Sequence, residues 1–157
     1  MNKLLLAGMA LIGLVGAGIS GGSFVVRKEQ PMEIQTEILQ ELHSRFSALP
    51  GANLKRIDCK PIFSYDTSKS TLCFISRVKT ENLLPMFQHS LAQIAQTNGW
   101  TQDYGVWGAF YALNVRPKWT FGVNVESIES SADFEGLDSL KGFESFVSVT
   151  VSSQPKP

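Results

Sequence analysis

Residues that commonly carry out catalysis are scarce in this sequence. It has two histidines, His43 and His89, and two cysteines, Cys59 and Cys73, among 157 residues. It contains no G-x-S-x-G nucleophile elbow, no P-loop, no G-x-G-x-x-G fingerprint and no H-E-x-x-H motif. The cysteines do not form a C-x-x-C pair, the spacing typical of zinc sites and thioredoxin-like enzymes. The sequence therefore predicts a non-enzymatic protein without a cofactor or a metal site.

An excess of charge of either sign is also missing. Lys and Arg number 14, as do Asp and Glu, so the formal net charge is zero. Because contact with a phosphate backbone requires clustered Lys and Arg, nucleic acid is excluded as a partner. Apolar residues make up 43% of the chain and charged residues 18%, which is typical of a globular protein.

The N-terminal region lacks charge over a long run, from Leu4 to Val26. As a helix, these residues would span about 35 Å, enough to cross the hydrocarbon core of a bilayer. The run fits a signal peptide cleaved after Ala17 or Ser20, and it fits equally a retained membrane anchor that ends at Arg27. Either alternative predicts export to the periplasm or to the outer face of the cytoplasmic membrane, and the short Met-Asn-Lys start is typical of bacteria. We expect residues 1–26 to be this leader, 27–153 one domain and 154–157 a tail.

The two cysteines support export. Both fall in predicted strands, 54–63 and 71–78, which flank a segment of turn-forming residues. A hairpin that turns around Asp66 places Cys59 directly opposite Cys73 and Ile57 opposite Ile75, a spacing that suits a disulfide. Disulfides persist in oxidising compartments, so the leader and the bond support each other.

Hydrophobic periodicity predicts the other elements. Apolar residues recur every four positions after Pro31 and stop at Pro50, and a second helix is expected from Thr80 to about Thr97. Alternating patterns predict strands over 100–115, 119–128 and 146–151. The predicted order is α-β-β-α-β-β-β, a largely antiparallel sheet with two helices packed on one face, which is an α+β fold.

Aromatic residues supply the candidate binding surface. In the strand over 100–115, Trp107 and Tyr111 alternate with Tyr104 and Phe110, so that one set faces the core and the other faces solvent. Exposed Trp and Tyr are frequent anchors at interfaces, so we take Trp107 and Tyr111, with Trp119 of the next strand, as the candidate surface. The alternative is that both faces are covered and these side chains belong to the core. An acidic stretch, 126–144, is a second candidate surface.

These observations favour an envelope protein that binds a protein partner of open identity, and touches the membrane through its leader if that is retained. The class includes inhibitors and immunity proteins against secreted toxins. One alternative is a small periplasmic hydrolase in which His43 or His89 meets a carboxylate and a hydroxyl. Another is a structural role with the helix from Pro31 as a stalk, which predicts few contacts between that helix and the sheet.

Overall fold

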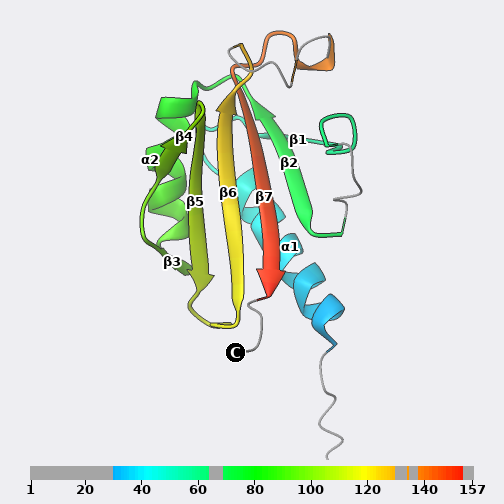
Figure 1. The fold of residues 1–157 in the computed structure, drawn as a ribbon, viewed down its shortest axis with the longest axis vertical. Helices are drawn as coiled ribbons and strands as arrows, with labels where there is room; N and C mark the ends of the chain where they lie inside the picture. The colour runs from blue at the N-terminus through cyan, green and yellow to red at the C-terminus, as the bar shows by residue number, and fades with distance from the viewer. Residues whose placement is uncertain (1–29, 64–68, 130–133, 135–137, 154–157) are drawn as a thin grey trace, which may run out of the picture.

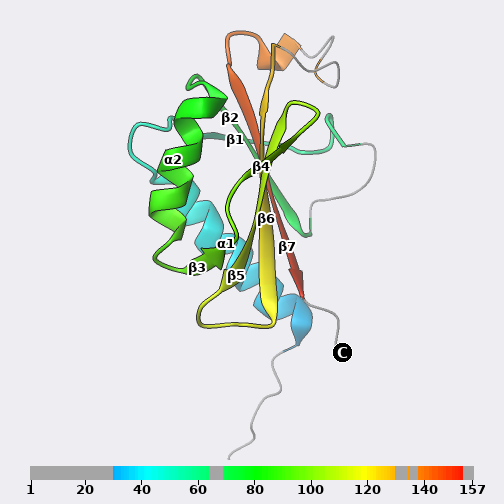
Figure 2. The same cartoon turned by 60° about the vertical axis from the view of Figure 1, so that its left-hand side comes forward.

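The computed structural model describes residues 30–63, 69–129, 134 and 138–153. The predicted leader and tail lie outside these residues. The described chain is an antiparallel sheet with two helices on one of its faces, so the predicted α+β fold is confirmed (Figures 1 and 2). Its elements are α1 (Pro31–Ser47), β1 (Lys55–Ile57), β2 (Thr71–Ser76), α2 (Thr80–Leu91), β3 (Ala95–Thr97), β4 (Thr101–Asp103), β5 (Val106–Leu113), β6 (Trp119–Ser127), the 3-10 helix η2 (Asp138–Leu140) and β7 (Ser145–Ser153).

The strand order is β1-β2-β7-β6-β5-β3, with β4 paired to β5. The long strands β5, β6 and β7 form the middle of the sheet, and β7 connects them to the β1–β2 hairpin. The start of α1 and the end of β7 lie at one end of the molecule, and η2 lies at the opposite end (Figure 1).

Helix α1 begins at Pro31, where a missing amide hydrogen costs little, and ends shortly before Pro50. Its buried residues are Ile38, Leu39, Leu42 and Phe46. The helix lies against the sheet, with the Phe46 ring centroid 5.6 Å from that of Phe74 in β2. The alternative in which this helix is a stalk with few contacts to the sheet is therefore wrong, because the apolar stripe of α1 is part of the core.

Helix α2 is shorter than predicted. It ends at Leu91 and not near Thr97, and after a turn the chain forms β3, in which Ala95 pairs with Leu113 and Thr97 with Tyr111. The backbone of β3 forms hydrogen bonds with the edge of β5, and the side chain of Ala95 is still buried in the core. Burial of an apolar residue is therefore preserved although its secondary structure was predicted incorrectly.

The segment predicted as one strand over 100–115 is a hairpin. Strands β4 and β5 pair from Thr101–Gly108 to Asp103–Val106, so that Tyr104 and Gly105 form a two-residue turn. Both turn residues have positive φ, 45° and 84°, as a type I′ turn requires. The single strand predicted over 100–115 is therefore divided in two, because the chain reverses at Tyr104 and Gly105.

The alternation predicted for the last two long strands is confirmed. On β6, Trp119, Phe121, Val123 and Val125 face the helices, and on β7, Val147, Val149 and Val151 do so. They form one hydrophobic core with the buried stripes of α1 and α2. This face of the sheet is closed.

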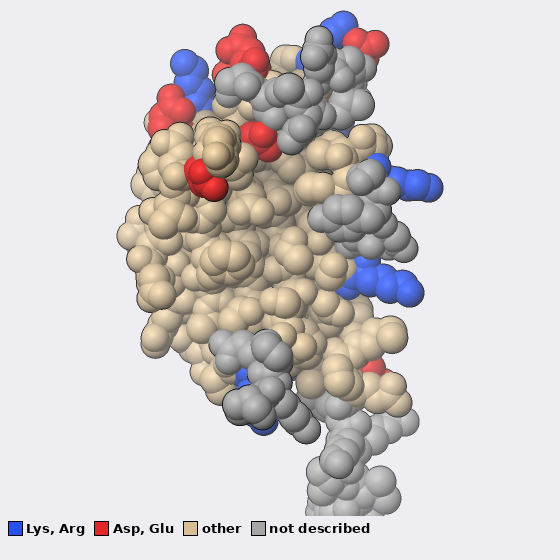
Figure 3. All heavy atoms as spheres, in the orientation of Figure 1, with Lys and Arg blue, Asp and Glu red and all other residues tan. Residues whose placement is uncertain are grey.

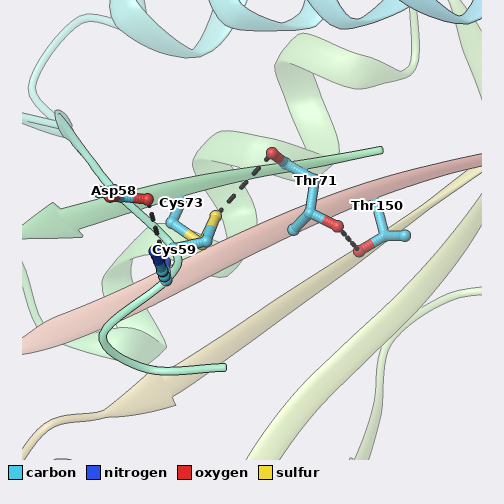
Figure 4. The surroundings of a disulfide bond; sticks show 6 residues. Asp58, Cys59, Thr71, Cys73 and Thr150 are labelled. Atoms are coloured by element: carbon cyan, nitrogen blue, oxygen red, sulfur yellow. Dashed lines mark hydrogen bonds between the residues drawn. A yellow bond between two sulfur atoms is a disulfide. The ribbon is translucent and has the colours of Figure 1, made fainter. Parts of the chain in front are cut away.

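The predicted disulfide is confirmed and it lies on the other face of the sheet. Cys59 and Cys73 are bonded, with their Cα atoms 5.4 Å apart (Figure 4). The Sγ of Cys59 lies 3.8 Å from the carbonyl oxygen of Thr71, a contact without a hydrogen bond because an oxidised sulfur carries no hydrogen. Around the bond a second cluster forms: Cys59, Cys73, Ile75, Phe134, Leu140 and Phe146.

The predicted register around this bond is wrong by two residues. Ile57, not Cys59, stands opposite Cys73, and Lys55 stands opposite Ile75. Strand β1 ends early because the chain turns: the Lys60 amide donates to the Asp58 carboxylate over 3.0 Å. The disulfide therefore joins the first turn after β1, and not the strand itself, to β2.

Candidate functional site

The middle of the outer face of the sheet is built from small and uncharged residues. The register of β5, β6 and β7 arranges the outward positions in three rows. These rows are Gly108–Asn124–Ser148, Phe110–Gly122–Thr150 and Ala112–Thr120–Ser152. In the space-filling view, charged side chains lie around the margin of this face and leave its middle free of charge (Figure 3). We call these nine positions the open face; Ser148, on the side toward β2, is the one buried residue among them.

Phe110 is the large apolar residue of the open face, and 81% of its surface is exposed. Its ring lies over the backbone of Gly122, since a β-carbon at Gly122 would lie 3.3 Å from Cε1 of Phe110. A glycine within a strand often marks such a close approach. The ring therefore rests on β6 while its outer surface faces solvent.

Hydroxyl pairs bridge neighbouring strands on the same side of the sheet. The Oγ1 of Thr120 lies 3.1 Å from the Oγ of Ser152, and Thr71 and Thr150 pair through their Oγ1 atoms over the same distance. Because these hydroxyls bond to each other across the ladder, they add little height to the surface. The open face is therefore flat and uncharged, with one exposed aromatic ring.

The candidate binding residues predicted from the sequence lie mainly on the other side. Tyr111 is 1% exposed and Trp119 9%, and both belong to the core, whereas Trp107 is half-buried against it. The predicted exposure of Tyr111 and Trp119 is therefore wrong. The odd-numbered residues of β5 face the helices, so the even-numbered set, which contains Phe110, faces solvent.

Tyr111 has an unusual polar environment. Its hydroxyl and the Nε1–H of Trp100 are buried, and neither has a hydrogen-bond partner among the described residues. Burial raises the pKa of Tyr111 to about 12, and the nearby indole of Trp100 opposes this effect to a smaller extent. The Tyr111 ring stacks on Phe121 with centroids 5.0 Å apart, which indicates a core role.

The two histidines lie on the exposed sides of the helices. His43 on α1 has its Nε2 3.5 Å from the Oγ of Ser47, and its ring stacks on Phe74 at a centroid distance of 6.1 Å. His89 is exposed on α2. Neither histidine lines either of the two cavities described below.

Buried hydroxyls form a network where β2, α2 and β7 meet. The Oγ of Ser145 donates to the carbonyl of Val78 over 2.7 Å and lies 3.1 Å from the Oγ1 of Thr80. The amide of Val78 donates to the Oγ of Ser76 over 2.9 Å. These hydroxyls are buried and bonded, so they fix the start of α2 on the sheet.

Residues of the acidic stretch, 126–144, line a cavity of about 340 Å³. The cavity has an apolar lining of Ile128, Phe134, Leu140 and Phe143, and charged residues Glu129, Asp138, Lys141 and Glu144. Asp138 pairs with Lys141 over 2.6 Å, and both side chains are highly exposed. Asp133 and Glu135 lie outside the described residues.

A smaller cavity of about 220 Å³ lies beside the turn after β1 and includes Asp58 and Ser139. Among the residues with described positions, no three His, Cys, Asp or Glu side chains come together in a way that could hold a metal ion. Within the same part of the chain, no helix is long and apolar enough to cross a membrane. No family model, no curated protein and no solved structure matches the chain.

Sequence reasoning missed Phe110 as the exposed aromatic residue. The available signal is Gly122, which interrupts the polar alternation of Thr120 and Asn124. In a hairpin closed by the turn at 114–118, Gly122 stands opposite Phe110. A glycine opposite an aromatic residue on the polar side of a strand indicates a ring that lies on the sheet surface.

Proposed function

We propose that this chain is a non-enzymatic protein of the bacterial envelope that binds a protein partner through the open face of its sheet. The observation that carries the proposal is the exposed ring of Phe110, which lies over Gly122 at the centre of the nine uncharged positions. Aromatic side chains in the centre of a patch supply much of the binding energy of protein interfaces. Inhibitors and immunity proteins against secreted toxins fall within this class.

Two features support an extracytoplasmic location. The uncharged run from Leu4 to Val26 has the length of a signal peptide or membrane anchor. The disulfide between Cys59 and Cys73 suits an oxidising compartment. The protein would be released into the periplasm or held at the outer face of the cytoplasmic membrane.

The position at which α1 begins adds a geometric argument. Helix α1 begins at the end of the molecule opposite η2 (Figure 1). In an anchored protein, the η2 end would point away from the membrane, and the strands of the open face would run from the membrane side outward. A partner could then reach the open face from the side.

Photo-crosslinking in cells tests the open face. A benzophenone amino acid replaces Phe110 in one variant and Val115, 84% exposed in the β5–β6 turn, in the control. We expect a crosslinked adduct from position 110 and none from position 115. An envelope protein that is present at normal amounts but gives no adduct from position 110 would remove the open face as the binding surface.

Intact mass measured with and without reductant tests the location. The protein recovered from cells should accept no alkylating reagent before reduction and should accept it at Cys59 and Cys73 afterwards. If the leader is cleaved, the measured mass should also be lower by the mass of residues 1–17 or 1–20. Full alkylation before reduction, in a chain that fractionates with the cytosol, would contradict export.

The alternative function is a small periplasmic hydrolase that uses His43 or His89. The observation that favours His43 is its 3.5 Å approach to the hydroxyl of Ser47. This alternative predicts hydrolysis of an ester substrate that is lost in His43→Ala or Ser47→Ala, and the His89→Ala variant tests the second histidine. Activity that is absent, or unchanged in all three variants, would reject the hydrolase.

A further inference from the structure

We infer that the partner on the open face is a second copy of this chain, so that two sheets pack face to face around a two-fold axis. This inference rests on the proposed function, because it takes the open face as the binding surface and names its occupant. It is carried by the charge, the shape and the orientation of that face.

Charge is the first argument. In a two-fold symmetric contact, the same patch meets itself, so any charge near the axis meets a like charge. Like charges brought together in an interface are costly, and uncharged residues avoid this cost. The nine positions of the open face are uncharged, and the charged side chains lie at its margin (Figure 3). The face is therefore compatible with its own copy.

Shape is the second argument. Phe110 is flanked by Gly108 and Ala112 on β5 and lies over Gly122 on β6. Small neighbours leave the ring exposed above a flat surface, where it can contact the same ring or the hydroxyl rows of another copy. A symmetric contact uses Phe110 twice, once from each chain.

Size sets the expected strength. The nine positions of the open face span about five residues on each of three strands, roughly 17 Å by 14 Å, which gives a planar area of roughly 240 Å². This area is below the roughly 600 Å² per partner that bounds weak and transient interfaces. We therefore expect a dimer that dissociates on dilution, and not an obligate one.

Orientation is the third argument. A two-fold axis parallel to the central strands keeps the start of α1 of both copies at the same end of the dimer (Figure 1). Two chains that each continue into a membrane leader could therefore pair without either leaving the membrane. The same arrangement is available to two released copies.

Sedimentation of the full chain as recovered from cells, in mild detergent if the leader is retained, tests the inference. The average mass should rise from one chain toward two over a concentration series that reaches the millimolar range. Phe110→Asp should raise the dissociation constant at least about tenfold. Ala112→Glu, which introduces a charge without removing the ring, should act in the same direction. Val115→Asp lies in the β5–β6 turn and should leave the constant within about twofold.

Far-ultraviolet circular dichroism and the melting temperature establish that each variant is folded. A single chain mass at every concentration would overturn the inference, as would a dimer that neither variant at the open face weakens. A monomer whose position 110 crosslinks to a different protein in cells would overturn the second copy and keep the proposed function. A monomer with no adduct from position 110 would reject both.

Discussion

The two faces of the sheet are made by alternate residues of the same strands, and they differ completely in environment. On β5 and β6, Tyr111 and Phe121 stack beneath the helices, whereas their neighbours Phe110 and Gly122 lie together on the open face. The two aromatic residues of β5 are adjacent in sequence and similar in size. Alternation therefore defines two faces but does not determine which one the helices cover.

The outer face is itself divided. Near β1 and β2, the disulfide-linked turn and η2 cover Cys73, Ile75 and Phe146, which form the second cluster. Across β5 and β6, the face is left open around Phe110. The covalent bond thus holds a short segment on one half of a face whose other half is left uncovered around Phe110.

The largest difference between the faces should appear in stability. Phe121→Ala removes a fully buried ring from the core and should lower the free energy of unfolding by about 3–5 kcal/mol. Phe110→Ala removes an exposed ring from the opposite face and should cost less than about 1 kcal/mol. Urea unfolding of the two variants measures both values. Similar losses for the two substitutions would contradict the distinction between a closed and an open face.

The covered half of the outer face should depend on its covalent bond. Replacement of Cys59 and Cys73 together by Ala opens a loop of about 15 residues and should cost about 3 kcal/mol. Reduction of the unmodified protein should cause a similar loss, measured by urea unfolding with and without reductant. A loss below about 1 kcal/mol would show that the second cluster holds this turn in place without the bond.

The closed face should respond to alkaline pH through Tyr111. In the unfolded chain a tyrosine loses its proton near pH 10, whereas burial raises the pKa of Tyr111 to about 12 in the folded state. Below pH 10 Tyr111 is protonated in both the folded and the unfolded state, so the free energy of unfolding does not depend on its titration. Between pH 10 and 12 the unfolded chain loses this proton while the folded protein keeps it, so the free energy of unfolding falls. The slope should approach about 1.4 kcal/mol per pH unit.

Tyr111→Phe is the matched control, because it keeps the ring and removes the titrating hydroxyl. The difference in unfolding free energy between the two proteins should change between pH 10 and 12 and stay constant below that range. If the unfolding free energies of the two proteins fall in parallel, the Tyr111 hydroxyl does not titrate as a buried group.

The smallest effect concerns an ion pair at the edge of the closed face. Arg116 in the β5–β6 turn donates to Glu37 of α1 over 2.6 Å, and both side chains are partly exposed. Arg116→Ala should lower the free energy of unfolding by about 0.2–1 kcal/mol, less at high salt. A loss of several kcal/mol in thermal unfolding would mean that this turn contributes more to the packing of α1 than the exposed pair can supply.

Local sequence signals were sufficient for much of the fold. Pro31 and Pro50 bracket α1, and the alternation of β6 and β7 identifies their buried residues. The disulfide was predictable because the two cysteines stand 14 residues apart on either side of a segment rich in turn-forming residues. These features depend on residues close in sequence.

The errors arise where distant residues decide the structure. Ala95 fits a helical stripe, but its backbone bonds to Leu113, which stands 18 positions later. The register of β1 depends on the turn at Asp58 and not on the centre of the β1–β2 loop. The exposure of Phe110 depends on which face the two helices cover, and no pattern within β5 contains that information.

The most direct test of the open face as the binding surface compares Phe110 with Tyr104, which is 99% exposed at the tip of the β4–β5 turn and is not one of the nine positions of that face. Hydroxyl-radical labelling would be measured at both residues in intact cells and in dilute purified protein. We predict that labelling of Phe110 falls severalfold in cells while that of Tyr104 stays unchanged. Equal labelling of Phe110 in the two conditions would contradict a partner on the open face.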